Sequence, residues 1–241
     1  MTYQVRAYRN NVKAEDLTKF EIIEKETDLL VLAQTNLYDK ALAAAVKYRT
    51  DLEKYIESDP QFAKTLSPYR IRYDAPPIVK EMATYSRKAK VGPMAVVAGA
   101  MAEFVGKDLL PFTEELIVEN GGDIFLKISK PRKVGIYAGD SPFSEKIALE
   151  LDPQPKPFSV CTSSGTVGHS FSFGKADAVV VIAQSALLAD AAATAIGNVV
   201  KEISDIDQAL KSAKKIRGLD GVLIIKGDQL GALGRVKLVP L

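Results

Sequence analysis

An alanine-rich run, Ser185-Ala-Leu-Leu-Ala-Asp-Ala-Ala-Ala-Thr-Ala-Ile-Gly-Asn198, constrains the fold more than any other part of this 241-residue chain. Alanine favours helix and has a small side chain, so another backbone or a flat ligand can approach such a helix closely. Asp190 and Thr194 stand alone among the alanines and, four residues apart, project from one face. A carboxylate and a hydroxyl together suit a hard divalent cation. The alternative is a packed helix in which Asp190 is solvated and Thr194 bonds a helix carbonyl.

Composition indicates an ordinary globular protein. The chain is 47% hydrophobic and 26% charged, with a net charge of +2, so it can bury a large core without disulfide staples. We predict one domain over residues 1–241, with the site-bearing core at about 91–200. The near-balanced charge argues against a nucleic-acid partner.

The single cysteine and the N-terminal segment are informative about the cellular location of the protein. Cys161 is the only cysteine, so an intrachain disulfide is excluded, and we interpret it as a small packed residue. The segment Met1-Thr-Tyr-Gln-Val-Arg-Ala-Tyr-Arg9 has no apolar run of the kind that begins a secretory signal. No uninterrupted apolar stretch reaches the length of a membrane span. A cytoplasmic protein with no membrane partner is therefore expected.

Hydrophobic periodicity predicts strands and then helices in the first half of the chain. Strands are expected at 20–24 and 28–34. Helices are expected at 37–58, 60–66, 77–89 and 93–105. The last of these is apolar nearly all round, which predicts a central, buried position.

The second half is predicted to begin with strands at 114–119 and 123–128, joined by a tight Asn120-Gly121-Gly122 turn. Further strands are expected at 133–137, 146–151, 158–161 and 178–183, followed by the alanine-rich helix and a helix at 205–216. Strands at 221–225 and 235–239 are expected to close the chain as a hairpin around residues 228–234. Runs of strands beside runs of helices favour an α+β fold over a doubly wound one.

Four segments contain the residues most suited to a ligand site. They are Val91-Gly-Pro-Met-Ala-Val-Val-Ala-Gly-Ala100, Asn120-Gly-Gly-Asp123, Thr162-Ser-Ser-Gly-Thr-Val-Gly-His169 and Ala189-Asp-Ala-Ala-Ala-Thr-Ala195. The order and the residues of these four segments resemble those of the ApbE family of flavin transferases, and still more those of a shorter, uncharacterised family related to it. The resemblance covers roughly residues 91–200. Its most specific element is the Ala-Asp-Ala-x-x-Thr-Ala motif after Val-Val-Val-Ile-Ala.

The resemblance implies an α+β, tunnelling-fold-related mixed sheet with packed helices, and magnesium and FAD as cofactors. Family members transfer FMN from FAD to a Thr or Ser of an acceptor protein, and some cleave FAD to FMN and AMP. By motif, Asp190 and Thr194 become magnesium ligands. A backbone carbonyl ligand would fall near residues 92–95.

The turn and the polar loop are expected to hold the nucleotide. Asn120, Gly121, Gly122 and Asp123 match the turn near the flavin, whereas on spacing alone a simple hairpin is equally consistent. In the loop, hydroxyls and amides of a short polar run offer an anion-binding nest, and the alternative is a flexible loop. The run comprises Thr162, Ser163, Ser164, Gly165 and Thr166. His169, the only histidine, is the candidate catalytic residue, to bind phosphate or move a proton.

The chain also departs from the family pattern. The family's Ala-Lys-Gly step falls near Ala95-Val96-Val97, which has no lysine, and no Asp-Pro follows His169. Three hypotheses therefore stay open. The protein is an ApbE-like enzyme acting on FAD, a nucleotide or phosphate-ligand binder without that chemistry, or a structural protein whose alanine-rich helices form a homo-oligomer core.

Overall fold

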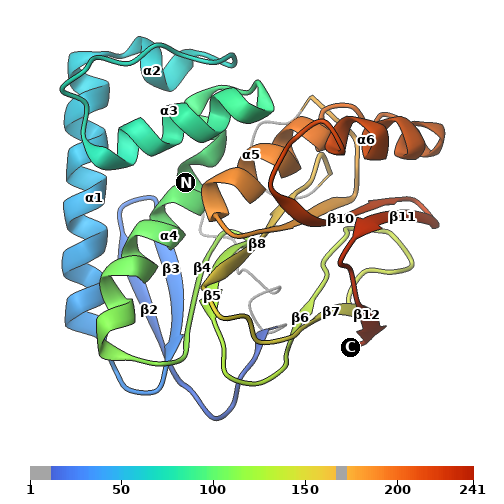
Figure 1. The fold of residues 1–241 in the computed structure, drawn as a ribbon, viewed down its shortest axis with the longest axis horizontal. Helices are drawn as coiled ribbons and strands as arrows, with labels where there is room; N and C mark the ends of the chain where they lie inside the picture. The colour runs from blue at the N-terminus through green and yellow to red at the C-terminus, as the bar shows by residue number, and fades with distance from the viewer. Residues whose placement is uncertain (1–11, 167–172) are drawn as a thin grey trace.

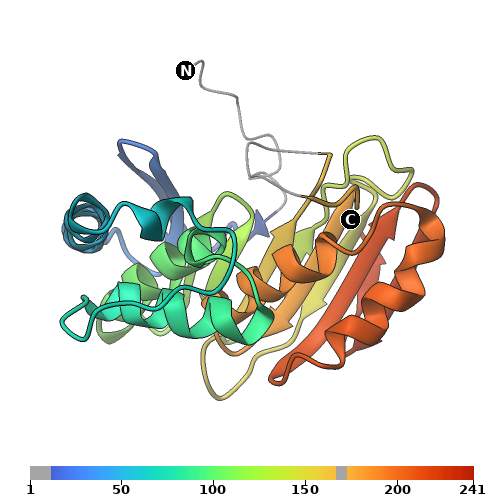
Figure 2. The ribbon, with the colours of Figure 1, turned by 90° about the horizontal axis from the view of Figure 1, so that it is seen from above.

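The computed structural model describes residues 12–166 and 173–241. Their strands form two antiparallel sheets, stacked beneath a layer of helices (Figures 1 and 2). This arrangement confirms the α+β prediction. The large sheet has the strand order β11-β10-β9-β8-β5-β4-β3-β2, and the small sheet has the order β1-β6-β7-β12.

The large sheet is built from hairpins that are close in sequence. Tight turns at Lys25-Glu26, Gly121-Gly122 and Gly227-Asp228 join its β2/β3, β4/β5 and β10/β11 pairs. The φ angles of Gly121 and Gly122 are 66° and 100°, which side chains rarely adopt and which the predicted Asn-Gly-Gly turn requires. The strands are β2 (Thr18–Glu24), β3 (Thr27–Ala33), β4 (Leu116–Asn120), β5 (Asp123–Lys127), β8 (Phe158–Ser163), β9 (Ala178–Ala183), β10 (Leu219–Lys226) and β11 (Gln229–Gly234).

The small sheet comprises β1 (Val12–Lys13), β6 (Arg132–Gly135), β7 (Ile147–Leu151) and β12 (Leu238–Pro240). The prediction that residues 221–225 and 235–239 form a closing hairpin is wrong. β10 pairs with β11, inside the segment expected to be a loop, because the chain turns at Gly227 with a φ of 60°. Residues 238–240 then leave the large sheet and pair with β7.

Helices cover one face of the large sheet. α1 (Tyr38–Ser58) packs on β2, α4 (Val97–Leu109) on β4 and β5, α5 (Ala186–Gly197) on β8 and β9, and α6 (Ile206–Ala213) on β10 and β11. α2 (Gln61–Lys64) and α3 (Pro77–Ala89) lie over the others (Figure 1). The short helices η2 (Pro93–Val96), η3 (Leu110–Phe112) and η4 (Ile203–Asp205) complete the set, and η2 gives the predicted 93–105 helix a tighter first turn.

Two hydrophobic cores result, one on each face of the large sheet. In β9, Val179 and Val181 face the helices, whereas Val180 and Ile182 face the small sheet. Every residue of β9 is buried, which explains why this strand reads as a continuous apolar run rather than an alternating one.

Candidate functional site

The alanine-rich helix α5 carries the centre of the candidate site. Its residues from Ala186 to Ala193 are all buried within this chain, between the sheet and the neighbouring helices α3 and α4. These alanines therefore serve packing within the chain, whereas Thr194 and Ala195 further along the helix are half-buried. Packing is closest at Gly99 of α4, where a Cβ would lie 2.6 Å from the Ala186 carbonyl oxygen.

A buried carboxylate fixes the start of α5. Glu103 of α4 is 4% exposed. It accepts hydrogen bonds from the Ser185 hydroxyl at 2.9 Å and from the Ala186 amide at 2.6 Å. A negative charge at a helix N-terminus satisfies free amides and complements the helix dipole. Glu103, which sequence reasoning missed, thereby sets the position of α5 and of Asp190 one turn further on.

Asp190 points from α5 toward α4 and the β4–β5 hairpin. Its Oδ2 accepts a hydrogen bond from the Gly99 amide at 3.0 Å. Its carboxyl group also hydrogen-bonds that of Asp123, the first residue of β5. The structure thus brings together two carboxylates from separate motifs that lie 67 positions apart in the sequence.

Burial dominates the electrostatics of this carboxylate pair. Asp123 and Asp190 are only 5% and 8% exposed. Burial raises the pKa of Asp190 to about 7, although the Gly99 amide and Asp123 oppose this. The pKa of Asp123 is also raised well above its usual value, first by burial and then by the charge of Asp190. Among the residues that the structure describes, no lysine or arginine forms an ion pair with Asp123 or Asp190.

Residues around the pair position backbone groups toward it. The Asn120 amide Nδ2 donates to the carbonyl oxygen of Ala98 at 3.2 Å, and the Thr162 amide donates to Asp123 Oδ1 at 3.3 Å. The Ala98 carbonyl belongs to the same trans peptide as the Gly99 amide that faces Asp190, so it points away from the carboxylate pair, and the carbonyl ligand expected near residues 92–95 stays a prediction. Burial raises the pKa of the Cys161 thiol well above its usual value, which agrees with a packed rather than reactive cysteine.

Thr194 and the glycine pair occupy the margin of this cluster. Thr194 is half-buried on α5, and no described residue hydrogen-bonds its hydroxyl. Gly121 and Gly122 form the turn before Asp123, and the Gly122 amide donates to Glu119 at 2.7 Å. A Cβ on Gly122 would still lie 3.9 Å from Thr162, so the turn and the polar loop are neighbours.

The polar loop is largely satisfied by internal bonds. The Gly165 amide donates to the Ala176 carbonyl at 2.9 Å, and the Thr166 amide to Ser164 Oγ at 3.1 Å. Thr166 Oγ1 also donates to Asp177 at 3.3 Å. These two amides are therefore engaged rather than open to an anion. Ser163 ends β8, and His169 lies outside the described residues.

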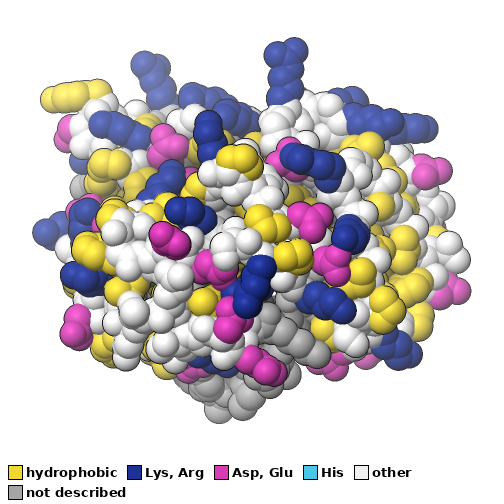
Figure 3. Space-filling model, turned by 60° about the horizontal axis from the view of Figure 1, so that its bottom comes forward, with side chains coloured by type: hydrophobic (Ala, Val, Ile, Leu, Met, Phe, Trp, Pro, Cys, Tyr) yellow, Lys and Arg dark blue, Asp and Glu magenta, His cyan; other side chains and the backbone are white. Residues whose placement is uncertain are grey.

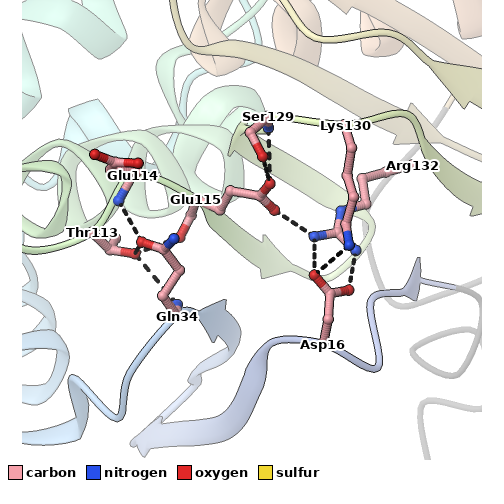
Figure 4. A network of polar contacts seen from close by, with 8 residues as sticks. All are labelled: Asp16, Gln34, Thr113, Glu114, Glu115, Ser129, Lys130 and Arg132. Carbon is pink, nitrogen blue, oxygen red and sulfur yellow. Dashed lines mark hydrogen bonds and ion pairs between the residues drawn. The ribbon is translucent and has the colours of Figure 1, made fainter.

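Another buried carboxylate, that of Glu115, offers a contrast (Figure 4). Glu115 forms an ion pair with Arg132, and both side chains are 5% exposed. Arg132 also pairs with Asp16, which Lys130 contacts at 2.9 Å. Here the chain supplies its own cation. Sequence reasoning missed this network, because its members are spread over three strands or loops that only the fold brings together.

Within the described ranges, no group of three or more His, Cys, Asp or Glu side chains is arranged to hold a metal ion. The Asp123–Asp190 pair therefore offers two carboxylates, and other oxygen atoms would have to complete a coordination shell. On the surface, acidic and basic side chains are interspersed over the face drawn in Figure 3. No single described helix is long and apolar enough to cross a membrane. The helices Pro77–Ala89 and Pro93–Phe112 pass that test only together, with a 102° bend between them.

The fold is that of ApbE proteins. The Pseudomonas stutzeri flavinyl transferase ApbE in its apo form aligns with a TM-score of 0.55 at 16% identity, covering 92% of this chain and 94% of its own. The ApbE protein from Thermotoga maritima gives a TM-score of 0.55 at 14% identity, with 89% and 96% covered. The flavin transferase ApbE from Vibrio cholerae gives 0.51 at 13% identity, with 95% and 97% covered.

The chain belongs to the family described as AbpE bacteria, whose model matches residues 9–234. A UPF0280 protein of Methanococcus vannielii is 44% identical over 227 residues, covering 92% of each chain. A UPF0280 protein of Methanocaldococcus jannaschii is 42% identical over 224 residues, covering 90% of this chain and 91% of its own. The match over nearly the whole chain confirms the resemblance seen in the four motifs.

Proposed function

We propose that this protein binds FAD or a related dinucleotide together with magnesium, and acts on the phosphate linkage of that ligand. The observation that carries the proposal is the buried Asp123–Asp190 pair, which has no basic partner among the described residues and lies against the Gly99 amide. Two desolvated carboxylates are costly without a cation. The fold is like that of ApbE flavin transferases, and the motif resemblance to that family implies FAD and magnesium as the ligands.

The donor set fits magnesium. Asp190 and Asp123 would supply carboxylate oxygens, and Thr194, one turn along α5, would supply a hydroxyl. Phosphate oxygens or water would complete the shell, as magnesium prefers. Bound magnesium would offset negative charge on the diphosphate and orient it for displacement.

The residues of the chain would bind and orient the nucleotide around this centre. The glycines of the 121–122 turn let the backbone approach the ligand closely. Thr162 of β8 lies beside this turn, whereas Ser163 lies on the other face of the strand, near Gly197 of α5. A hydroxyl of a Thr or Ser on an acceptor protein would attack the phosphorus on the FMN side of FAD. The new P–O bond forms as the bond to AMP breaks, and AMP leaves with the electron pair. With water as the nucleophile, the products are FMN and AMP. His169 is proposed to contact phosphate or carry the proton.

A second candidate function is nucleotide binding without turnover. The absence of a lysine at residues 95–97 and the engaged amides of Gly165 and Thr166 favour it. The two functions share the carboxylate pair and differ in whether FAD is consumed.

The deciding experiment is titration of the purified protein with FAD, with and without magnesium, followed by chromatography of the nucleotides. Magnesium-dependent FMN and AMP, lost in Asp190→Ala and kept in Asp140→Ala, would support the enzyme. Asp140 is exposed and far from the site in sequence, so it is a matched control for loss of a carboxylate. Saturable binding without products would select the second function. Turnover that survives in Asp190→Ala would refute the assignment of the site.

A further inference from the structure

The large sheet ends in two edge strands, β2 and β11, among the strands that the structure describes. β11 lies at the right-hand edge of the molecule in Figure 1. β10 pairs with it on one side, and α6 packs on one of its faces, where a Cβ at Gly231 would lie 2.5 Å from Ile206. No described strand covers its outer edge. An open edge presents unpaired backbone donors and acceptors to any strand that fits.

The register identifies which residues of β11 face outward. The Ile225 carbonyl accepts a hydrogen bond from the Asp177 amide beside β9, so Ile225 and its alternate neighbours in β10 bond toward β9. The intervening residues of β10 bond β11, and their partners there are Gln229, Gly231 and Leu233. The amides and carbonyls of Leu230 and Ala232 therefore point away from the sheet.

The two edges differ in how they are protected. By the same alternation, the outward-facing residues of β2 are Lys19, Glu21 and Ile23, and charges on an edge discourage further pairing. β11 reads Gln-Leu-Gly-Ala-Leu-Gly, without a charged residue, and its register with β10 has no bulge. Leu230 is 37% exposed at this edge. β11 therefore lacks the usual devices that block strand addition.

We propose that β11 is a homodimer interface, in which two copies of the chain pair their β11 strands antiparallel about a two-fold axis. The strand is complementary to itself in this arrangement. Leu230 of one copy would exchange both backbone hydrogen bonds with Ala232 of the other, and Gly231 would face Gly231 at the axis. That central pair is of the closely spaced, non-hydrogen-bonded kind, about 4.5 Å between Cα atoms, where the absence of side chains relieves crowding.

The exposed side chains of the same strand support a second copy as the occupant. Cross-strand partners share a face, so Leu230 of each copy would lie over Ala232 of the other and bury apolar surface. The two eight-stranded sheets would join into one continuous sheet, with the candidate sites on separate copies. A pairing of six residues buries less than a standard interface, so the dimer should form at micromolar rather than nanomolar concentrations.

Sedimentation velocity over a wide concentration range tests the proposal with the full-length protein. The wild type should shift from monomer to dimer with rising concentration. Ala232→Pro removes an outward amide that the chain's own sheet does not use, and should raise the dimer dissociation constant by about tenfold or more. Ile23→Pro makes the same change at an outward-facing position of β2 and should leave the dimer intact. A wild type that stays monomeric up to crystallisation concentrations, or a dimer equally weakened by both variants, would overturn the proposal.

Cross-linking gives a second reading that does not depend on the proline variants folding. Ala232→Cys with a short bis-maleimide should yield covalent dimers, whereas Ile23→Cys should not. The native Cys161 is fully buried, so it does not contribute. Covalent dimers from Ile23→Cys alone would place the interface at the other edge and reject β11. A β11 edge that binds an added peptide strand while the protein stays monomeric would identify a different occupant and also reject the second copy.

Discussion

Two of the clusters of buried carboxylates in this protein differ in whether a basic side chain accompanies them. In one, Glu115 and Asp16 surround Arg132. In the other, Asp123 and Asp190 meet beside the Gly99 and Thr162 amides and the Cys161 thiol, and no described lysine or arginine forms an ion pair with them. Burial acts on both, yet the outcomes are opposite. The pKa of Glu115 is lowered, because hydrogen bonds from Ser129 and Arg132 outweigh its burial, whereas the pKa of Asp190 is raised to about 7.

The comparison separates a structural ion pair from a site that lacks its counter-charge. A chain that can place an arginine beside Glu115 has the means to neutralise a buried carboxylate. No arginine or lysine of the described residues forms an ion pair with Asp190, which favours a charge there that is matched by a bound cation or by protons. The contrast therefore supports the proposed metal site without recourse to any relative.

The largest effect should come from removing the internal cation. Arg132→Ala leaves Glu115 buried and unpaired, which should lower the free energy of unfolding by about 3–5 kcal/mol. Urea denaturation at pH 7 measures the loss. A change below about 1 kcal/mol would mean that the network of Figure 4 is not a structural ion pair, and the comparison would fail.

For the Asp123–Asp190 pair, we expect removal of a charge to raise the free energy of unfolding rather than lower it. The pKa of Asp190 is higher in the folded chain than its ordinary value of 3.8, so the folded state holds a proton that the unfolded state loses as pH rises from about 4 to about 7. Without metal, the wild type should therefore lose stability over this range. Asp190→Asn escapes that penalty and should be more stable than the wild type by about 1–3 kcal/mol at pH 8, with no advantage at pH 4.

Glu115→Gln is the matched control for this variant. It neutralises a carboxylate of similar burial that has a cation, and it should be destabilising at pH 8 rather than stabilising. Thermal unfolding of both variants at pH 4 and pH 8 measures the difference. If both variants shifted stability in the same direction, the distinction between the clusters would be lost.

Magnesium should take the place of protons at the acidic pair. If binding displaces one proton, the affinity for magnesium should rise about tenfold per pH unit up to pH 7 and level off above it. Calorimetry in two buffers of different ionisation enthalpy counts the protons released. Binding with no proton release would argue that the ion sits elsewhere.

The smallest effect is expected at the exposed end of the paired cluster. Asp16 is 44% exposed in its ion pair with Arg132, and Asp16→Asn leaves the Glu115 partner in place. Solvent screens such a contact, so the melting temperature should fall by no more than about 1–2 °C. A drop as large as that of Arg132→Ala would show that Asp16 belongs to the buried part of the network.

The sequence predicted local structure more reliably than long-range contact. Hydrophobic periodicity located α1, α3, β3 and β9 nearly to the residue, because each has one strong pattern and clear capping or turn residues. The closing hairpin failed because Gln229–Gly234 is rich in glycine and small residues. Such a segment has the composition of a loop, and it becomes a strand only because β10 offers it a partner.

The candidate site shows the same difference between local features, which the sequence predicted, and long-range contacts, which it did not. The motifs singled out Asp123 and Asp190 separately, but their contact depends on Gly99, 91 positions from Asp190, which lets α4 approach α5. Glu103 and Asn120 act through backbone groups of distant segments. No spacing rule reveals such contacts. Thr194 remains a prediction from the helix face, and His169 remains one from motif alone.

The burial of β9 on both faces has a consequence for motion. Its valines and isoleucine belong to the two cores at once, so its amides should open to solvent only when the whole domain unfolds. Gln184 and Ser185 link this strand directly to α5. We therefore expect Asp190 to be anchored to the part of the protein whose amides exchange most slowly.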